Sequence, residues 1–384
     1  MNILLIINES GTRPSGVVNV VKNKVAFWGA EDSITILSNK NCQINSSKLI
    51  KDWKSINSRL SFESKWSPTD VNYKFKLIQI FIRPLLNFYS IFVLIPWLKS
   101  KKFDAIISHC GGWPTAGLNR SIIFSSWLTG ISKRILVIHN YPKKYPKLLS
   151  FIYLFYSKIY EIFSTNVVTV SESCRKSLIR VAGFSDPKVI YNGIEKIDNA
   201  AYKKEIIWKN GKTSIGFVGE IHPRKGIHLL LESMKRITSP CNLVIIGSGY
   251  NVTYQNKLNS ISRELIHEVF FLGFRNDAIE LYNYLDILVL PSISYESFGL
   301  VILEAMQCKV PVICSDFGGM KEIIKDGQTG LIFKSNDSKD LSNAINNLIT
   351  NPSLRKKIIK NATLKVQKHF STSPMIQKYK NLIN

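Results

Sequence analysis

Two glutamates eight positions apart, Glu296 and Glu304, lie where an apolar run ends and a helix is expected to begin. The apolar run 287–292 has the character of a buried strand, and doubly wound sheets bind their ligands at the carboxyl ends of parallel strands. The backbone N–H groups expected among the unpaired donors of the helix start are those of Phe298, Gly299 and Leu300. Such donors, together with the helix dipole, suit a phosphate. The segment therefore predicts an anion cradle with two acceptors for hydroxyl groups, which is what a phosphorylated sugar requires.

Two neighbouring cations, Arg224 and Lys225, mark a second junction of the same kind. They follow the apolar run 214–219 and precede a helical pattern over 228–237, so we expect them at the end of another strand. A lysine there suits a diphosphate and an arginine adds bidentate contacts, although a solvated basic pair is the plainer alternative. The sequence contains no Asp-x-Asp pair. We therefore expect these cations and backbone amides to meet the charge of a diphosphate, with no bound metal.

The first half of the chain carries weaker signals. Gly16 begins an expected valine-rich helix, where a residue without a side chain lets a phosphate or a sugar approach the backbone; an ordinary tight turn is the alternative. His139 ends the apolar run 134–138, which places it at the mouth of a sheet, either as a donor to a substrate hydroxyl or as a satisfied structural histidine. His109 ends another such run, and Ser171 is expected to cap a helix.

Near-continuous apolar runs alternate with helical patterns along the chain, which is typical of parallel sheets covered on both faces. The runs of the first half are 2–7, 34–37, 103–109, 134–139, 166–171 and 188–191. Those of the second half are 214–219, 242–247, 269–273, 287–291, 310–315 and 330–333. Two such series predict an α/β protein with two Rossmann-like, doubly wound domains whose strand ends face a cleft. We expect domains at 1–192 and 193–369, with a last helix near 370–384 that packs back on the first domain.

The composition suits a globular protein without a leader segment. The chain has 384 residues, of which 45% are hydrophobic, enough for two sizeable cores. The amino terminus lacks a basic segment before its short apolar run, so we expect a buried strand rather than a signal peptide. Six scattered cysteines without a Cys-x-x-Cys pair are expected to be reduced core residues, which is typical of the cytosol.

The formal net charge of +24 is concentrated in the first half of the chain. Residues 1–190 contain 26 Lys and Arg against 10 Asp and Glu, whereas the remaining residues contain 25 against 17. An anionic membrane surface, nucleic acid, and drift towards lysine in a composition rich in Asn, Ile and Lys are the competing explanations. No helix-turn-helix, zinc-finger or RNP-like pattern accompanies the charge, so nucleic acid is the weakest of the three.

One segment, 73–102, supports the membrane explanation. Its uncharged stretch 85–98 has fourteen residues, fewer than the roughly twenty needed to span a bilayer. An aromatic-rich helix pair flanked by lysines fits the interfacial pattern, and a buried helix of the first domain is the alternative. A second apolar segment, 148–163, is expected to be an ordinary core helix.

Together these residues resemble the GT-B glycosyltransferases, and in particular glycosyltransferase family four. The mark of that family is a Glu-x7-Glu element that runs into a helix, matched here by Glu296 and Glu304. Further stretches that fit are 189–193, 225–226, 304–308, 310–313, 318–322 and 326–330. The resemblance covers roughly 165–335 and is looser before it.

The resemblance implies a GT-B fold and retaining transfer of a sugar from a UDP- or GDP-linked donor, with no further cofactor. It implies that Glu304 holds the ribose hydroxyls and that Glu296 holds the donor sugar near the anomeric centre. It also implies that Lys225 and the amides of Phe298, Gly299 and Leu300 contact the phosphates. By the same resemblance, Arg275 contacts the base and His139 contacts the donor sugar.

The chain departs from the family pattern at two positions. Glu220 stands where many members have an arginine, and an acidic group there opposes a diphosphate unless it points away. Our hypothesis is that Arg224 supplies the missing charge. The usual paired glycine of the first-domain loop is reduced to Ser15-Gly16, so that loop matches the family pattern only in part.

The expected function is that of a hexosyltransferase-type enzyme of bacterial surface polysaccharide synthesis, such as that of O-antigen, lipopolysaccharide or capsule. Its acceptor would be a saccharide or lipid-linked saccharide, and the basic first domain would hold the cytoplasmic enzyme on the inner face of the membrane. The alternatives are a GT-B enzyme with a soluble acceptor, a sugar-nucleotide epimerase, and a non-catalytic nucleotide-sugar binding protein. The presence of both glutamates and of Lys225 favours an enzyme.

Overall fold

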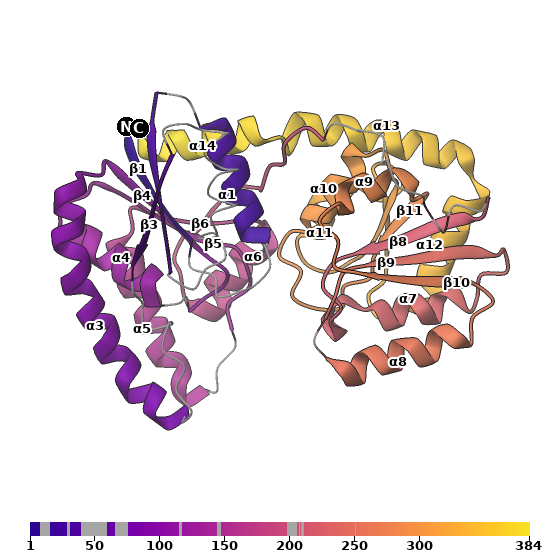
Figure 1. Ribbon diagram of the computed structural model, residues 1–384, viewed down its shortest axis with the longest axis horizontal. Coiled ribbons are helices and arrows are strands. Elements are labelled where there is room, and N and C mark those ends of the chain that lie inside the picture. Colours follow the sequence, from indigo (N-terminus) through magenta and orange to yellow (C-terminus); the bar gives the residue numbers. More distant parts are fainter. Residues whose placement is uncertain are drawn as a thin grey trace. The chain divides into compact units, whose positions relative to one another are not determined.

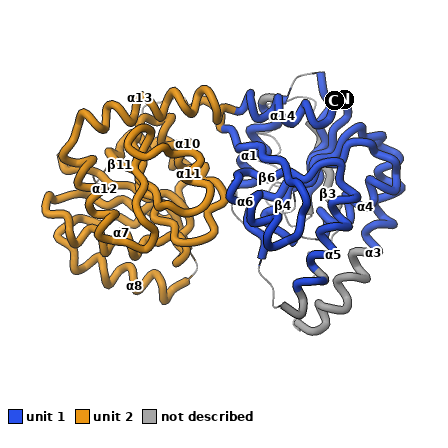
Figure 2. Tube along the Cα trace, turned by 180° about the vertical axis from the view of Figure 1, so that it is seen from behind, with its two compact units in different colours: residues 1–193, 372–384 blue, residues 194–371 orange. Residues whose placement is uncertain are grey.

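The computed structural model describes residues 1–7, 16–28, 31–39, 60–65, 76–114, 117–143, 147–197, 206, 208, 211–249 and 251–384. The chain forms two compact units. Unit 1 comprises Met1–Gly193 and Thr372–Asn384, and unit 2 comprises Ile194–Ser371 (Figure 2). Ser15 and most of the predicted linker 193–212 lie outside the described residues.

Unit 1 contains a seven-stranded sheet in the order β3-β2-β1-β4-β5-β6-β7, and every pairing in it is parallel. The strands are β1 (Asn2–Ile7), β2 (Ser33–Asn39), β3 (Leu60–Lys65), β4 (Ala105–Cys110), β5 (Lys133–Ile138), β6 (Asn166–Thr169) and β7 (Lys188–Val189). Six of these match the apolar runs of the sequence. The edge strand β3 was not predicted, because four of the six residues of its sequence, LSFESK, are polar.

The helices of unit 1 cover both faces of this sheet. They are α1 (Gly16–Phe27), α3 (Lys76–Lys101), α4 (Gly117–Leu128), α5 (Lys147–Phe163), α6 (Glu172–Ser177) and α14 (Thr372–Ile383). Helix α4 packs against α3 and α5, and α1 packs against α14 (Figure 1). As predicted, Ser171 caps α6, since its hydroxyl accepts a hydrogen bond of 3.1 Å from the Cys174 amide.

Unit 2 contains a six-stranded parallel sheet in the order β10-β9-β8-β11-β12-β13. The strands are β8 (Thr213–Val218), β9 (Cys241–Ile246), β10 (Glu268–Gly273), β11 (Ile287–Leu290), β12 (Val312–Ser315) and β13 (Leu331–Phe333). All six lie in predicted apolar runs. The strand order reverses between β8 and β11, and such a switch point is where open α/β sheets bind their ligands.

The helices of unit 2 are α7 (Ile227–Met234), α8 (Val252–Arg263), α9 (Ala278–Leu281), α10 (Leu300–Gln307), α11 (Met320–Ile323), α12 (Ser338–Thr350) and α13 (Pro352–His369). Helix α7 packs against α8 and α12, whereas α10 packs against α13 (Figure 1). The sheet fits closely between these layers. At Gly216 of β8, for example, an added Cβ atom would lie 2.3 Å from a methyl carbon of Leu285.

The apolar segments of unit 1 differ from the sequence expectations in two ways. Helix α3 is one continuous helix of 26 residues rather than a helix pair. The expectation that 148–163 is an ordinary core helix is wrong, because α5 exposes several large apolar side chains, among them Phe151, Phe155 and Ile162. Within the described part of the chain, no helix is both long and apolar enough to cross a membrane.

The cysteine expectation is confirmed wherever the structure describes a cysteine. Cys110, Cys174, Cys241, Cys308 and Cys314 are all buried free thiols. Burial raises the pKa of Cys308 to about 11, which keeps this thiol protonated and unreactive. Cys42 lies outside the described residues.

Candidate functional site

The loops that follow β8 and β11 in unit 2 pack backbone against backbone at the switch point. Gly226 adopts φ +69°, and an added Cβ atom would lie 1.9 Å from the carbonyl oxygen of Pro291. The amide of Ile293 donates to the carbonyl of Arg224 at 2.9 Å. Glycine is therefore required at position 226, both for the left-handed backbone and for the close approach. This contact brings the basic loop after β8 beside the acidic loop after β11.

Lys225 and Glu296 form an ion pair at this contact, although 71 positions separate them in the sequence. The distance from Lys225 Nζ to Glu296 Oε2 is 2.5 Å, and the two side chains are 15% and 10% exposed. The hydroxyl of Ser292 donates to the same carboxylate oxygen at 3.0 Å. Burial alone would raise the pKa of Glu296, but the charge and hydrogen bond of Lys225 outweigh it and lower that pKa. Glu296 is therefore ionised at neutral pH.

The loop that carries Glu296 is also held by its own backbone. Tyr295 adopts φ +51°, an uncommon conformation for a residue with a side chain. The Glu296 carbonyl accepts a hydrogen bond of 3.1 Å from the Gly319 amide. Such strain persists where the surroundings fix a residue, and it is concentrated at functional sites.

Helix α10 begins directly after this loop, as predicted. Gly299 precedes its first residue with φ +98°, and Leu300 is that first residue. Phe298 is 2% exposed and packs edge-on against Phe370, with ring centroids 6.0 Å apart. This buried ring anchors the start of the helix, whose first-turn N–H groups are the donors that the sequence assigned to an anion.

Glu304 lies on the second turn of α10, half buried, and accepts a hydrogen bond of 3.0 Å from the hydroxyl of Tyr282. Burial raises the pKa of Glu304, and the hydrogen bond from Tyr282 offsets only part of this effect. The two glutamates thus differ in environment. Glu296 is held as a carboxylate by a cation, whereas Glu304 is held by a neutral phenol.

The two arginines predicted at the site are both paired with carboxylates of their own loops. Arg224 contacts Glu220 at 3.0 Å, so the unexpected acidic residue is balanced within the loop. Arg275 forms a bidentate pair with Asp277, with two contacts of 2.7 Å. Lys225 and Glu296 thus lie in the loops after β8 and β11, Glu304 lies on α10, and Arg275 lies in the loop after β10.

Gly16 and His139 belong to unit 1. Gly16 is the exposed first residue of α1. His139 directly follows β5, is 6% exposed, and donates from its amide to the Cys110 carbonyl at 2.9 Å. Burial, and secondarily the charge of Lys24, lowers the pKa of His139 to about 3, so its imidazole is neutral at physiological pH.

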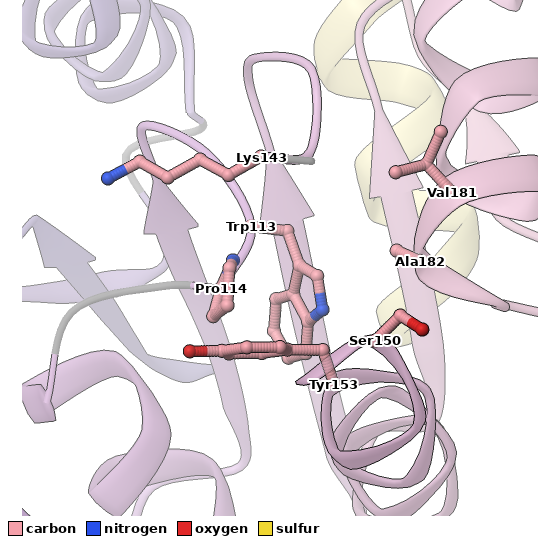
Figure 3. A pocket seen from close by; sticks show the side chains of 7 residues that line it. All are labelled: Trp113, Pro114, Lys143, Ser150, Tyr153, Val181 and Ala182. Atoms are coloured by element: carbon pink, nitrogen blue, oxygen red, sulfur yellow. The ribbon is translucent and has the colours of Figure 1, made fainter. Parts of the chain in front are cut away.

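Unit 1 also contains a cavity of about 260 Å³ beyond the ends of β4 and β5. Its walls are Trp113, Pro114, Lys143, Ser150, Tyr153, Val181 and Ala182, drawn in Figure 3. Pro114 and Lys143 lie on one side, with Val181 and Ala182 opposite them. A hydrogen bond fixes the orientation of the Trp113 ring, because its indole N–H donates to the Ser157 hydroxyl at 2.8 Å. The cavity therefore combines a rigid aromatic wall with one ammonium group.

The sequence analysis missed the lining residues Lys143, Ser150 and Tyr153 of this cavity, and also three residues that support the predicted site residues. Ser292 and Tyr282 support the two glutamates, and Lys24 lies behind His139. The position of Ser292 at the end of an apolar run was a usable signal. Nothing in the sequence distinguished Tyr282 or Lys24 from an ordinary aromatic residue or a surface lysine.

Two family models match the chain, and together they span most of it. Residues 198–365 match the model of the glycosyl transferases group 1, and residues 60–196 match that of glycosyltransferase family 4. Together with the two doubly wound units and the Glu-x7-Glu element, these matches define the class as a two-domain GT-B glycosyltransferase. The chain belongs to glycosyltransferase family four.

Individual relatives support this assignment. An uncharacterised glycosyltransferase of Methanocaldococcus jannaschii is 34% identical over 236 residues, which cover 56% of this chain and 58% of the relative. The capsular polysaccharide biosynthesis glycosyltransferase CapM of Staphylococcus aureus is 28% identical over 288 residues, which cover 71% and 75%. Two curated relatives are matched over only about half of their own length, 58% and 46%.

The fold resembles solved structures along the entire chain. The crystal structure of Anabaena HepE in complex with UDP and glucose superimposes with a TM-score of 0.76 at 20% identity, covering 99% of this chain and 98% of HepE. At this identity the similarity establishes the fold, which is GT-B.

Proposed function

We propose that this chain transfers a sugar, with retention of the anomeric configuration, from a nucleotide diphosphate sugar to a saccharide or lipid-linked saccharide acceptor. The observation that carries the proposal is the buried Lys225–Glu296 pair at the switch point between β8 and β11. An ionised carboxylate and an ammonium group stand there beside the first turn of α10. That combination suits a ligand with sugar hydroxyls next to a diphosphate.

In this proposal each group of unit 2 has one task. Glu304 holds the ribose hydroxyls, and Glu296 holds hydroxyls of the transferred sugar. Lys225 and the first-turn N–H groups of Phe298, Gly299 and Leu300 hold the phosphates. Arg275 lies beside the base, with its guanidinium oriented by Asp277.

The charges of Lys225 and Glu296 both act in the proposed reaction. The bond from the anomeric carbon to the phosphate oxygen breaks, and negative charge develops on the departing diphosphate. Lys225 and the first-turn amides stabilise that charge. The acceptor oxygen then bonds to the anomeric carbon from the same face, and its proton passes to the departing diphosphate. Glu296 stabilises the positive charge that develops on the sugar, so no second carboxylate has to act as a nucleophile.

Glu220 does not oppose this chemistry in the proposal. Its carboxylate is balanced by Arg224. Lys225 and the first-turn N–H groups of α10, rather than Arg224, then bind the diphosphate. This modifies the hypothesis drawn from the sequence, in which Arg224 supplied the charge. The absence of an Asp-x-Asp pair from the sequence supports a reaction without a bound metal and without a cofactor beyond the donor.

For the acceptor we propose the cavity of unit 1. Its aromatic wall of Trp113 and Tyr153 suits the face of a sugar ring or an isoprenoid chain, and Lys143 suits a phosphate. Ser150 and Tyr153 belong to α5, whose outer side exposes Phe151 and Phe155 at 64% and 65%. The helix that lines the cavity thus also exposes large apolar side chains, which favours a lipid-linked acceptor.

Membrane association follows from the same surface. Helix α3 exposes Tyr89 and Phe92, and its last turn and the following position carry the exposed Lys99, Lys101 and Lys102. Apolar side chains beside lysines are the composition of an interfacial surface on anionic lipid. The enzyme would therefore act as a peripheral protein on the inner face of the cytoplasmic membrane, in the synthesis of a bacterial surface polysaccharide.

A donor screen tests the proposed reaction. UDP- and GDP-linked sugars are incubated with the protein and a membrane extract, and product is followed by mass shift and by the anomeric signals in its NMR spectrum. We expect one donor class to give a product whose anomeric configuration matches that of the donor. A product of inverted configuration, or an epimerised donor without transfer, would refute the proposal.

A further inference from the structure

Lys24, on the inner side of α1, is completely buried, and among the residues that the structure describes no acidic side chain contacts it. Its Nζ atom lies 3.3 Å from Nε2 of His109 and 3.4 Å from the ring centroid of Tyr379 on α14. Its exposed fraction is 0%. Lysines are almost never fully buried unless they are paired with an anion, because removing an ammonium group from water is costly. A methionine would fill this position without that cost, so its presence calls for a role beyond packing.

The contact of Lys24 with His109 continues to His139. Nδ1 of His109 lies 2.8 Å from Nε2 of His139, and the two rings stack with an interplanar angle of 28°. His109 is completely buried, whereas His139 retains 6% exposure at the end of β5. The three side chains therefore form a hydrogen-bonded row from the core of unit 1 to its surface. Nδ1 of His139 is the ring nitrogen at the outer end of this row.

The chemistry of the three groups fixes the direction of the hydrogen bonds. A neutral imidazole has one N–H donor and one acceptor nitrogen, whereas an ammonium group only donates. Burial and the neighbouring charge of Lys24 lower the pKa of both histidines, so both rings are neutral. If Lys24 donates to Nε2 of His109, the proton of His109 is on Nδ1. That proton is donated to Nε2 of His139, which leaves the proton of His139 on Nδ1.

We propose that Lys24 and His109 are positioning residues that fix His139 as its Nδ1–H tautomer, so that it presents a hydrogen-bond donor to a hydroxyl of the donor sugar. The last clause rests on the proposed sugar transfer and on the contact of His139 with the donor sugar that the family resemblance implies, whereas the tautomer itself does not. The arrangement explains why a lysine without a carboxylate partner is kept in the core. An ammonium group only donates, so it imposes one direction on the hydrogen bonds of the row. A hydroxyl or a third imidazole can donate or accept and would not fix that direction.

The row also has a pH dependence. Among the described residues, the titratable groups that face Lys24 are His109 of β4, with His139 after β5 behind it, and Tyr379 of α14. Burial raises the pKa of Tyr379, so this ring is a neutral phenol whose face favours the ammonium form of Lys24. Burial lowers the pKa of Lys24 well below its usual value. When pH rises through that lowered pKa, Lys24 becomes able to accept a proton from His109, and the fixed direction is lost.

NMR of the full-length protein labelled with ¹⁵N-histidine tests the tautomer directly, without any substrate. In the wild type we expect the His139 signal to show a protonated Nδ1 and an unprotonated Nε2. In Lys24→Met, which keeps the volume and removes the donor, we expect Nε2–H or a mixture of the two tautomers. His109→Met, which breaks the row at its second member, should give the same change if the first variant folds poorly. Lys22→Met, at an exposed position of the same helix, should leave the wild-type pattern intact.

Measurements of activity then separate the two parts of the proposal, which are the tautomer of His139 and its contact with the donor sugar. Lys24→Met is expected to lower kcat/KM roughly tenfold, the worth of one well-placed hydrogen bond, and to remove the alkaline fall of the wild-type pH profile. A wild-type His139 protonated on Nε2, or a tautomer unchanged in both Lys24→Met and His109→Met, would overturn the role of the row. If the tautomer changes as expected while the activity of His139→Ala equals that of the wild type, the row stands and the proposed contact of His139 with the sugar fails.

Discussion

Replacing Lys225 by Met tests how strongly its ion pair with Glu296 holds unit 2 together. The change leaves a carboxylate that is 10% exposed and that keeps its hydrogen bond from the Ser292 hydroxyl. Removing one partner of a buried ion pair costs about 3–5 kcal/mol. We expect about 3 kcal/mol, the lower end of that range, because the site keeps some exposure and Glu296 can take up a proton.

The pH dependence of this loss follows from the direction of each pKa shift. In the wild type the pKa of Glu296 is lowered from 4.5, so its contribution to stability is present above pH 4.5 and is lost as pH falls through the lowered pKa. In Lys225→Met the effect of burial prevails and raises that pKa. The buried carboxyl group is then neutral in acid, so the cost of its charge disappears. The stability difference between variant and wild type should therefore begin to shrink above pH 4.5, as pH falls through the raised pKa of the variant, and shrink further below pH 4.5, as pH falls through the lowered pKa of the wild type.

Hydrogen exchange measured by mass spectrometry is the suitable assay, because it reports the opening of β8 and β11 separately from unit 1. Lys235→Met is the matched control, since Lys235 belongs to the same unit and its pair with Glu264 is exposed. The control should change protection little, as expected for a surface pair. Equal protection of β8 and β11 in Lys225→Met and the wild type, or a loss that is the same in acid and at neutral pH, would refute the reasoning.

Three further variants probe other parts of the account. Tyr282→Phe removes the hydrogen bond to Glu304, so donor affinity by calorimetry should fall by roughly three- to tenfold. Gly226→Ala should destabilise unit 2 by well over about 1 kcal/mol in urea unfolding, whereas Gly273→Ala, with a similar φ but no atom near its Cβ, should cost less. Phe155→Ser, at an exposed position of α5, should weaken sedimentation with anionic phosphatidylglycerol vesicles.

Each of these expectations has a contradicting outcome. Unchanged donor affinity in Tyr282→Phe would contradict the proposed contact of Glu304 with the ribose. Equal costs at Gly226 and Gly273 would mean that the backbone contact between the two loops is not what requires glycine. Vesicle binding that is as strong in Phe155→Ser as in Leu364→Ser, an exposed apolar position of unit 2, would remove α5 from the membrane surface.

The strands of this protein were predictable because parallel strands are buried on both faces. Apolar runs, most of them buried, identify twelve of the thirteen strands of the described residues. The exception, β3, lies at the edge of the sheet and needs fewer apolar residues. The same rule misled at α5, whose apolar sequence suggests a core helix. Hydropathy does not distinguish a helix side packed in a core from one exposed at a surface.

The candidate site was predictable wherever its chemistry is local in sequence. The spacing of Glu296 and Glu304 places one in a loop and the other in the following helix, as the structure describes. The pairing of Lys225 with Glu296 was not predictable, because it depends on two loops meeting at a strand switch point. The row of Lys24, His109 and His139 was even less so, since its members come from three elements and only their packing reveals it.

The most direct test of the central claim is the initial rate of nucleoside diphosphate release from the preferred donor in wild type and Glu296→Gln. The amide keeps the size of the side chain and removes the charge that pairs with Lys225. The account predicts a loss of at least about a hundredfold, typical of removing one group that stabilises a transition state, with Glu232→Gln at an exposed position of unit 2 close to wild type. Release by Glu296→Gln at the wild-type rate would contradict the assignment of this ion pair as the centre of sugar transfer.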